Sequence, residues 1–198
     1  MATVTDEALM TAVRDGDLAK LGLLFERHHA ALFDFLTWMT GNRGVAEDLV
    51  QDIFVRILKY RATYRDGGSF ATWLYRIARN ARADYFRARE PLEPIGVEAL
   101  SRPEPGPSPM RRLEADREQA RLKRALLELR EDKRELIVLT RFRGLSHQQI
   151  AELLGVEAGA VKVRIHRALK ELRDIFLTLS DGDPSCDVKR STRTLQII

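Results

Sequence analysis

Residues 144–172 read GLSHQQIAELLGVEAGAVKVRIHRALKEL and decide the fold of the C-terminal part of the chain. Ser146 followed by Gln149 is the pattern of a capping box, which predicts that a helix begins here. Gly155 predicts the left-handed residue that ends this helix, because glycine adopts a positive φ without strain. A second helix follows, with apolar residues at helical spacing at Val161, Ile165, Leu169 and Leu172. Two short amphipathic helices joined by a tight turn are typical of a helix-turn-helix.

The second of these helices is strongly basic. Residues 160–173 contain five Lys or Arg residues and one acid, Glu171. The polar residues on its outer face are Lys162, Arg164, His166, Arg167, Lys170 and Arg173. In a DNA-binding helix-turn-helix the second helix lies in the major groove, so we expect this face to contact DNA. The alternative is an ordinary helical hairpin with a solvated basic face, and the agreement of cap, turn and charge argues against it.

The N-terminal part is acidic and predicts four helices. Residues 1–60 contain nine acids and six bases. Apolar residues at helical spacing predict helices over residues 6–15, 17–40 and 45–60, with Gly16 and Gly41 ending the first two. The paired glycines in YRDGGS, residues 64–69, predict a loop.

Ser69 is the predicted cap of the fourth helix, FATWLYRIARNARADYFRARE, which covers residues 70–90. Its second part, residues 76–89, holds five arginines and one acid. Aromatic rings among arginines suit single-stranded nucleic acid, because bases stack on the rings while the phosphates follow the cations. The same rings at helical spacing also fit a hydrophobic core, and the pattern alone leaves both roles open.

Composition changes after this helix. Six of the seven prolines fall between residues 90 and 110, which predicts a semi-extended linker. A helix is then expected over residues 111–130. A second helix is expected to start after its cap at Asp132 and to run to Phe142, just before the helix-turn-helix. Residues 176–198 read as a polar tail. The predicted fold is therefore all-α, with helical domains at 1–89 and 111–175 joined by a Pro-rich linker at 90–110.

Several classes of function lack their usual signals. Cys186 is the single cysteine, which excludes an intramolecular disulfide and is natural in a reducing compartment. We find no signal peptide, no apolar run of membrane-spanning length, no phosphate-binding glycine loop and no dinucleotide fingerprint. His28 and His29 are adjacent and point to different sides of a helix, so no metal site is predicted. We expect a cytoplasmic, non-enzymatic protein without a cofactor.

Two long stretches of the sequence resemble a known family. LFERHHAALFDFL, AEDLVQDIFVRILK and GSFATWLYRIARNARADYFR resemble region 2 of the extracytoplasmic-function sigma factors, a group of the sigma-70 family. The stretch LLELREDKRELIVLTRFRGLSHQQIAELLGVEAGAVKVRIHRALKELR resembles region 4 of the same group. The order and the gap between these stretches also match. The resemblance implies a sigma factor that directs RNA polymerase to promoters.

The resemblance also implies roles for individual residues. The residues implied to bind the β′ coiled coil of core RNA polymerase are Asp48, Gln51, Asp52, Phe54 and Arg56. Those implied to capture and flank melted −10 DNA are Tyr64, Arg65, Ser69, Trp73, Arg76 and Asn80. Those implied to read −35 duplex DNA are Lys162, Val163, Arg164, His166 and Arg167. Further implied partners are the β flap of the polymerase, promoter DNA and an anti-sigma factor.

Two other functions compete with this interpretation. A dimeric helix-turn-helix regulator would bind duplex DNA tightly without being a polymerase subunit, but it would not need a second basic helix beyond a long linker. An enzyme acting on nucleic acid would need a metal cluster or a nucleophile with its base, and the sequence shows neither pattern.

Overall fold

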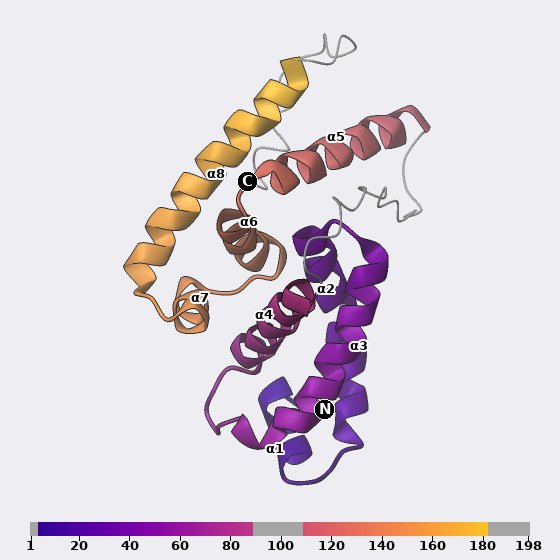
Figure 1. Cartoon of the computed structure of the whole chain (residues 1–198), viewed down its shortest axis with the longest axis vertical. Coiled ribbons are helices and arrows are strands. Elements are labelled where there is room, and N and C mark those ends of the chain that lie inside the picture. The colour runs from indigo at the N-terminus through magenta and orange to yellow at the C-terminus, as the bar shows by residue number, and fades with distance from the viewer. Residues whose placement is uncertain (1–3, 89–108, 182–198) are drawn as a thin grey trace.

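The computed structural model describes residues 4–88 and 109–181, and every regular element in these two ranges is helical (Figure 1). The all-α prediction is therefore confirmed. The elements are α1 (Asp6–Arg14), α2 (Lys20–Thr40), α3 (Arg43–Tyr60), η1 (Arg61–Thr63), α4 (Phe70–Ala88), α5 (Pro109–Glu128), α6 (Glu131–Ile137), η2 (Val138–Phe142), α7 (His147–Leu154) and α8 (Ala158–Asp181). Of these helices, none combines the length and the apolar character needed to cross a membrane.

Local signals in the sequence set most helix ends. The capping box at the start of α7 is complete: Ser146 Oγ accepts from the Gln149 backbone N–H at 3.2 Å, and Gln149 Oε1 accepts from the Ser146 backbone N–H at 2.9 Å. Gly41 and Gly155 end α2 and α7 with φ of 72° and 66°. These left-handed residues confirm the predicted helix ends, because only glycine adopts such φ values routinely.

Other helix ends differ from the prediction. Asp132 does not cap α6, which begins one residue earlier and has Arg130 at its N-cap without a side-chain hydrogen bond. The predicted helix from this point to Phe142 changes into a π-helix at Val138. Helix α8 continues to Asp181, six residues into the predicted tail, and α5 begins inside the predicted linker, at Pro109. The rest of that linker, and the tail after residue 181, lie outside the described residues.

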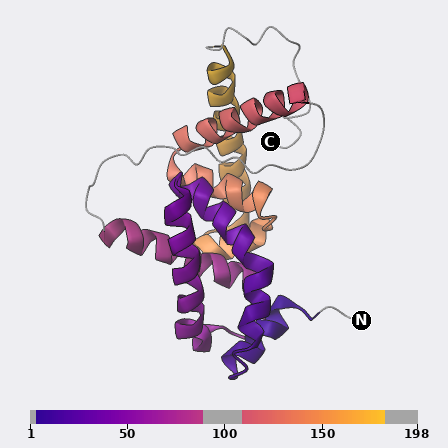
Figure 2. The ribbon, with the colours of Figure 1, turned by 90° about the vertical axis from the view of Figure 1, so that its right-hand side faces the viewer.

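The long helices α2 and α3 lie side by side, with α1 and α4 packed against them (Figures 1 and 2). Phe35, Leu36, Ile53 and Leu74 are fully buried between these helices. Burying each such side chain contributes about 1.5–3 kcal/mol to stability. This core holds the C-terminal end of α3, η1 and the start of α4 around the loop at 64–69.

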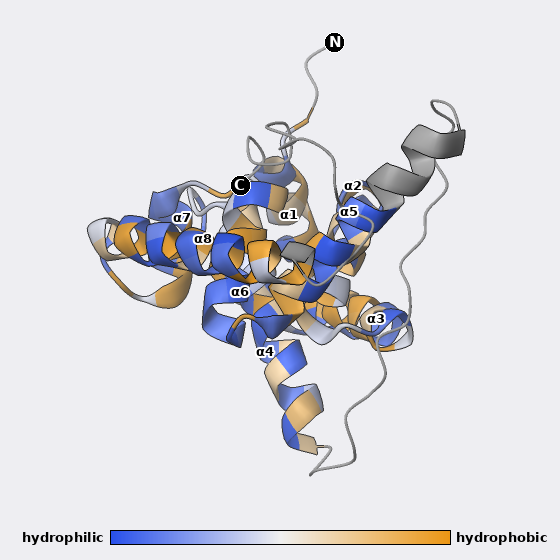
Figure 3. Ribbon diagram, turned by 90° about the horizontal axis from the view of Figure 1, so that it is seen from above, coloured by the Kyte–Doolittle hydropathy of each residue, from blue (hydrophilic) through white to orange (hydrophobic). Residues whose placement is uncertain are grey.

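The two halves of the chain share one buried core. Its residues include Leu32 and Tyr75 from the N-terminal half and Val138, Leu145 and Ile150 from the C-terminal half. A smaller cluster joins α5 to α8, and Figure 3 shows hydrophilic and hydrophobic residues alternating along α8, as in a helix with one buried face. The sequence predicted two domains but not that they pack directly on each other.

Polar contacts reinforce this packing. Arg143, whose side chain is 12% exposed, donates to the backbone oxygen of Ala31 at 2.9 Å and pairs with Asp34 at 3.6 Å. Arg134 reaches the backbone oxygen of Met39 at 3.2 Å. Both arginines belong to the C-terminal half and both contact α2, so the two halves are joined by hydrogen bonds as well as by apolar contacts.

Candidate nucleic-acid interface

The loop between η1 and α4 is closed by its own residues. Tyr64 is 3% exposed and donates its hydroxyl to the Gly68 backbone oxygen at 2.8 Å. Gly67 has a φ of 78°, which favours glycine, and a Cβ on Gly68 would make a tight contact of 3.2 Å with the Arg65 backbone oxygen. Arg14 of α1 donates to Asp66 at 2.8 Å and fixes the loop from outside. These contacts close the loop into a defined shape.

This loop forms one wall of a hollow of about 730 Å³, which we call the loop groove. Its other walls come from α4, from Tyr60 and from Glu152 of α7. All six residues predicted to contact −10 DNA line this groove: Tyr64, Arg65, Ser69, Trp73, Arg76 and Asn80. The sequence placed these residues on one loop and one helix, and the fold brings them around a common space.

Two of these six residues also form part of the core. Trp73 is 9% exposed and packs edge-on against Tyr64, with ring centroids 5.4 Å apart. Trp73 Nε1 donates to Thr63 Oγ1 at 3.4 Å, and burial raises the pKa of Tyr64. Of the two aromatic roles left open for the sequence, the structure shows the core role, because both rings are buried and support the loop; a stacking role for the edges that line the groove stays a prediction.

The α7 helix approaches the opposite edge of the groove. Gln149 Nε2 donates to Ser69 Oγ at 3.0 Å, and Arg76 lies 3.8 Å from Glu152. Deeper in the interface, Arg79 donates to Glu135 at 2.8 Å, and Arg82 pairs with Glu131. In this arrangement the helix-turn-helix half occupies polar groups of Ser69 and Arg76 that were predicted to face DNA.

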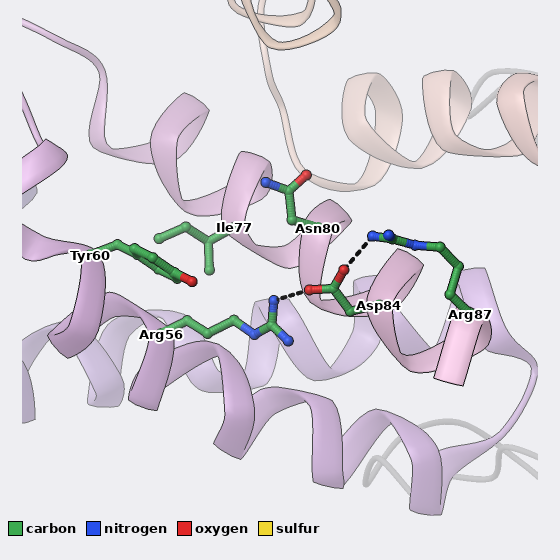
Figure 4. A pocket seen from close by; sticks show the side chains of 6 residues that line it. All are labelled: Arg56, Tyr60, Ile77, Asn80, Asp84 and Arg87. Atoms are coloured by element: carbon green, nitrogen blue, oxygen red, sulfur yellow. Dashed lines mark hydrogen bonds and ion pairs between the residues drawn. The ribbon is translucent and has the colours of Figure 1, made fainter. Parts of the chain in front are cut away.

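A second hollow of about 350 Å³ adjoins the loop groove, and we call it the α3–α4 pocket. Arg56, Tyr60, Ile77, Asn80, Asp84 and Arg87 line it (Figure 4). Asp84 accepts from Arg56 of α3 and from Arg87 of α4, and Arg56 also pairs with Asp52 at 2.8 Å. The hydrogen bond from Arg56 lowers the pKa of Asp84. Arg56, predicted to face the polymerase, thus points at α4.

The acidic face of α3 is exposed at two of its five predicted positions and half-buried at two more, Asp52 and Arg56. Asp48 and Gln51 are exposed, and the Asp52 side chain is 43% exposed. Phe54 is only 8% exposed and lies beneath Phe25 of α2, with ring centroids 4.9 Å apart. Phe25 is a large apolar side chain, yet it is 39% exposed beside the acidic face.

The basic helix α8 presents all five residues predicted to read duplex DNA. Its buried face consists of Val161, Ile165, Ala168 and Leu172. The five predicted residues, Lys162, Val163, Arg164, His166 and Arg167, are all exposed. The helical period therefore separated the packing face from the outer face correctly.

The sequence did not predict that Asp84 and Arg87 would line the α3–α4 pocket. Asp84 is the single acid in the arginine-rich segment 76–89 and lies one helical turn after Asn80, so it shares a face with that residue. Its partner Arg56 is 28 residues away, which no local pattern indicates. Among the described residues, no group of three or more His, Cys, Asp or Glu side chains could hold a metal ion.

Known proteins match both halves of the chain. The family profile of sigma-70 region 2 matches residues 24–91, and that of sigma-70 region 4 matches residues 119–172. RNA polymerase sigma factor CarQ of Myxococcus xanthus is 33% identical over 173 residues, which cover 84% of this chain and 95% of CarQ. The ECF RNA polymerase sigma factor SigE of Mycolicibacterium smegmatis is 34% identical, with 86% of this chain and 68% of SigE covered.

A solved structure matches the arrangement of both halves. The structure of CnrH in complex with the cytosolic domain of CnrY superposes on this chain with a TM-score of 0.65 at 29% identity. The superposition covers 90% of this chain and 98% of CnrH. The similarity therefore extends over the whole described fold and not over one domain alone.

Proposed function

The chain belongs to the extracytoplasmic-function group of the sigma-70 family, and from this membership we propose which of its surfaces carry out each step of initiation. As a sigma factor it binds core RNA polymerase and directs transcription to specific promoters. The dimeric regulator considered for the sequence is not favoured, because relatives that match 84% and 86% of this chain, across both halves, are RNA polymerase sigma factors. The protein acts by binding, in the cytoplasm where its polymerase is found.

The loop groove is the proposed site for one base of the melted −10 strand, and it is the observation that carries the proposal. The groove offers donors at Arg65 and Asn80, a third at Arg76 when its pair with Glu152 opens, and an aromatic wall at Tyr64 and Trp73. Extruding a base costs a few kcal/mol of unstacking, which stacking and phosphate contacts offset. A loop fixed before binding pays little further ordering entropy.

The exposed face of α8 is the proposed −35 reader. Lys162, Arg164, His166 and Arg167 are exposed on a helix whose opposite face is buried. An arginine that bonds guanine in bidentate fashion contributes about 1–3 kcal/mol of discrimination. Val163, which is 50% exposed, offers an apolar surface to a thymine methyl group.

The acidic face of α3 is the proposed contact with the β′ coiled coil of the polymerase. Asp48 and Asp52 give this face its negative charge and Gln51 adds a neutral amide, with Phe54 beneath the face and Arg56 at its edge. The C-terminal domain, which begins at about residue 111, would contact the β flap. We also propose an anti-sigma partner, as the family resemblance implies; the similar CnrH was itself solved in complex with a second protein, the cytosolic domain of CnrY.

To test the proposed polymerase contact, Asp52 is replaced with Arg, and complex formation with core polymerase is measured by size-exclusion chromatography. Asp52→Arg removes a partly exposed pair with Arg56 and sets two arginines one helical turn apart, and each effect costs the fold only about 0.3–0.5 kcal/mol. Asp17→Arg is the matched control, because Asp17 forms a similar pair with Lys20. We expect the Asp52→Arg protein to remain folded without binding core enzyme, while the control binds normally.

Two results would contradict this proposal. Unchanged affinity of the Asp52→Arg protein for core enzyme would exclude the assigned face. A wild-type protein that dimerises and binds duplex DNA tightly, without associating with polymerase, would exclude the sigma-factor function itself. Mapping transcript starts on genomic fragments with the same mixture would also supply the −10 and −35 sequences.

A further inference from the structure

The α3–α4 pocket lies next to the loop groove and shares three of its residues. Tyr60, Ile77 and Asn80 line both hollows. Its volume of about 350 Å³ is at the lower end of the range of about 300–1,000 Å³ that small-molecule sites occupy. A strand with one base in the loop groove would therefore place a neighbouring base at the mouth of this pocket.

The polar end of the pocket is a carboxylate between two arginines. One oxygen of Asp84 accepts from Arg56 and the other from Arg87, as Figure 4 shows. A carboxylate oxygen has more than one lone pair, so each can accept a further hydrogen bond. The Asp84 side chain is 41% exposed and therefore accessible from the pocket.

The two arginines also make the carboxylate compatible with a nucleic acid. An isolated acid would repel the phosphates of an approaching strand. Here Arg56 and Arg87 neutralise Asp84, and the Arg56 hydrogen bond lowers the pKa of its carboxyl, so it stays ionised. An ionised carboxylate only accepts hydrogen bonds, and it therefore selects ligands that donate.

We propose that the α3–α4 pocket reads a guanine in the melted strand next to the captured base, with Asp84 as the residue that determines this preference. Guanine is the one base whose free pairing edge has two adjacent N–H donors, N1–H and the N2 amino group, and these match the two oxygens of a carboxylate. The neighbouring O6 can accept from Arg87, which is 76% exposed and can reorient. The inference rests on the proposed function of the loop groove.

The role of Arg87 differs from that of Asp84. A side chain with this exposure also reaches a phosphate, which binds with the same strength whatever the base. Replacing Arg87 with Ala is therefore expected to weaken binding to all promoter sequences, with a smaller effect on base preference. Asp84→Asn is expected to change the preference itself, because an amide offers one acceptor and one donor in place of two acceptors.

The test uses holoenzyme assembled from core polymerase and the full chain. A promoter obtained by mapping transcript starts is changed to each of the four bases at every position of the melted stretch, and run-off transcripts are quantified. We expect wild type to favour guanine at one position beside the captured base by about tenfold, the ratio that one strong hydrogen bond supplies. Asp84→Asn should reduce this ratio to near one.

The control is Asp174→Asn, which makes the same chemical change at an exposed acid of α8. This variant should retain the guanine preference of wild type. Thermal unfolding of each protein separates a change in preference from a loss of fold, because the ratio between promoters does not depend on the fraction of protein that is folded.

The outcomes are distinct. Equal use of all four bases at both neighbouring positions by wild type, or preference for another base there, would overturn the inference and leave the sigma-factor function standing. A guanine preference that survives Asp84→Asn would also overturn it. Failure of wild type to form a complex with core polymerase would contradict the proposed function, and with it this inference.

Discussion

Breaking the ion pair between Arg79 of α4 and Glu135 of α6 is expected to destabilise the protein more than breaking a surface pair would. Arg79 Nε donates to Glu135 Oε1 at 2.8 Å across the junction between the two halves of the chain. The Glu135 side chain is 7% exposed and that of Arg79 is 33% exposed. The perturbation is a double-mutant cycle of Arg79→Ala, Glu135→Ala and the protein with both changes.

The burial of Arg79 and Glu135 sets the size of the expected loss in the free energy of unfolding. Exposed pairs contribute about 0.2–1 kcal/mol, whereas removing one partner of a buried pair costs about 3–5 kcal/mol. Glu135→Ala falls in the upper range, since Glu135 is buried and Arg82, whose side chain is 7% exposed, loses a nearby negative charge. Because Arg79 is partly hydrated, we expect a coupling energy of about 1–3 kcal/mol.

The assay is urea unfolding followed by tryptophan fluorescence. Trp38 of α2 packs against Phe142 of η2, with ring centroids 5.3 Å apart, so its emission reports on the junction. The matched control is a cycle on Arg130 and Asp132, a pair with side chains 77% and 62% exposed, where the coupling should stay below about 1 kcal/mol. A coupling for Arg79 and Glu135 no larger than in this control would refute the reasoning.

The same carboxylate predicts the direction of a pH effect. Burial raises the pKa of Glu135 above its ordinary value of 4.5, and the nearby Arg79 and Arg82 only partly oppose this. The folded state therefore binds this proton more tightly than the unfolded state. The resulting stability is fully present below pH 4.5 and is lost as pH rises through the raised pKa. Glu135→Gln should remove this contribution, so the wild type should lose stability relative to the variant over this rise in pH.

Three further predictions concern the helix-turn-helix. Ile165→Ala should lower the free energy of unfolding in urea by about 2–5 kcal/mol, because this side chain is 5% exposed. Val163→Ala should change it by less than about 0.5 kcal/mol, because Val163 is 50% exposed. Equal costs for the two variants would contradict the assigned faces of α8. Gly155→Ala should cost about 1–2 kcal/mol in the same assay, because φ is 66° and an added Cβ meets nothing within 4 Å, so only backbone strain acts. Arg164→Ala should reduce discrimination at one −35 position by about 1–3 kcal/mol in promoter-binding assays with substituted bases, and an equal loss on every sequence would indicate a phosphate contact instead.

Features that depend on neighbours along the chain could be predicted from the sequence. The capping box at Ser146 and the left-handed Gly41 and Gly155 arise from interactions within one helical turn, so a few residues define them. The helical period assigned Ile165 to the buried face of α8, and the glycines of YRDGGS marked the loop. The family resemblance implied the residues of the candidate −10 site, and they line one groove because one loop and one helix carry all of them.

Contacts between distant residues were decided only by the tertiary structure. Arg56 pairs with Asp84, 28 residues on, and Arg79 pairs with Glu135, 56 residues on, and neither the first pair nor the direct packing of the two domains could be predicted from local patterns. Helix α8 continues past Ile175, where Phe176 packs against the α5–α8 cluster. The physical reason is the same in each case: a side chain is buried or paired by whatever packs against it. Periodicity therefore gives the face on which a residue lies, and the folded chain alone gives the partner that the face meets.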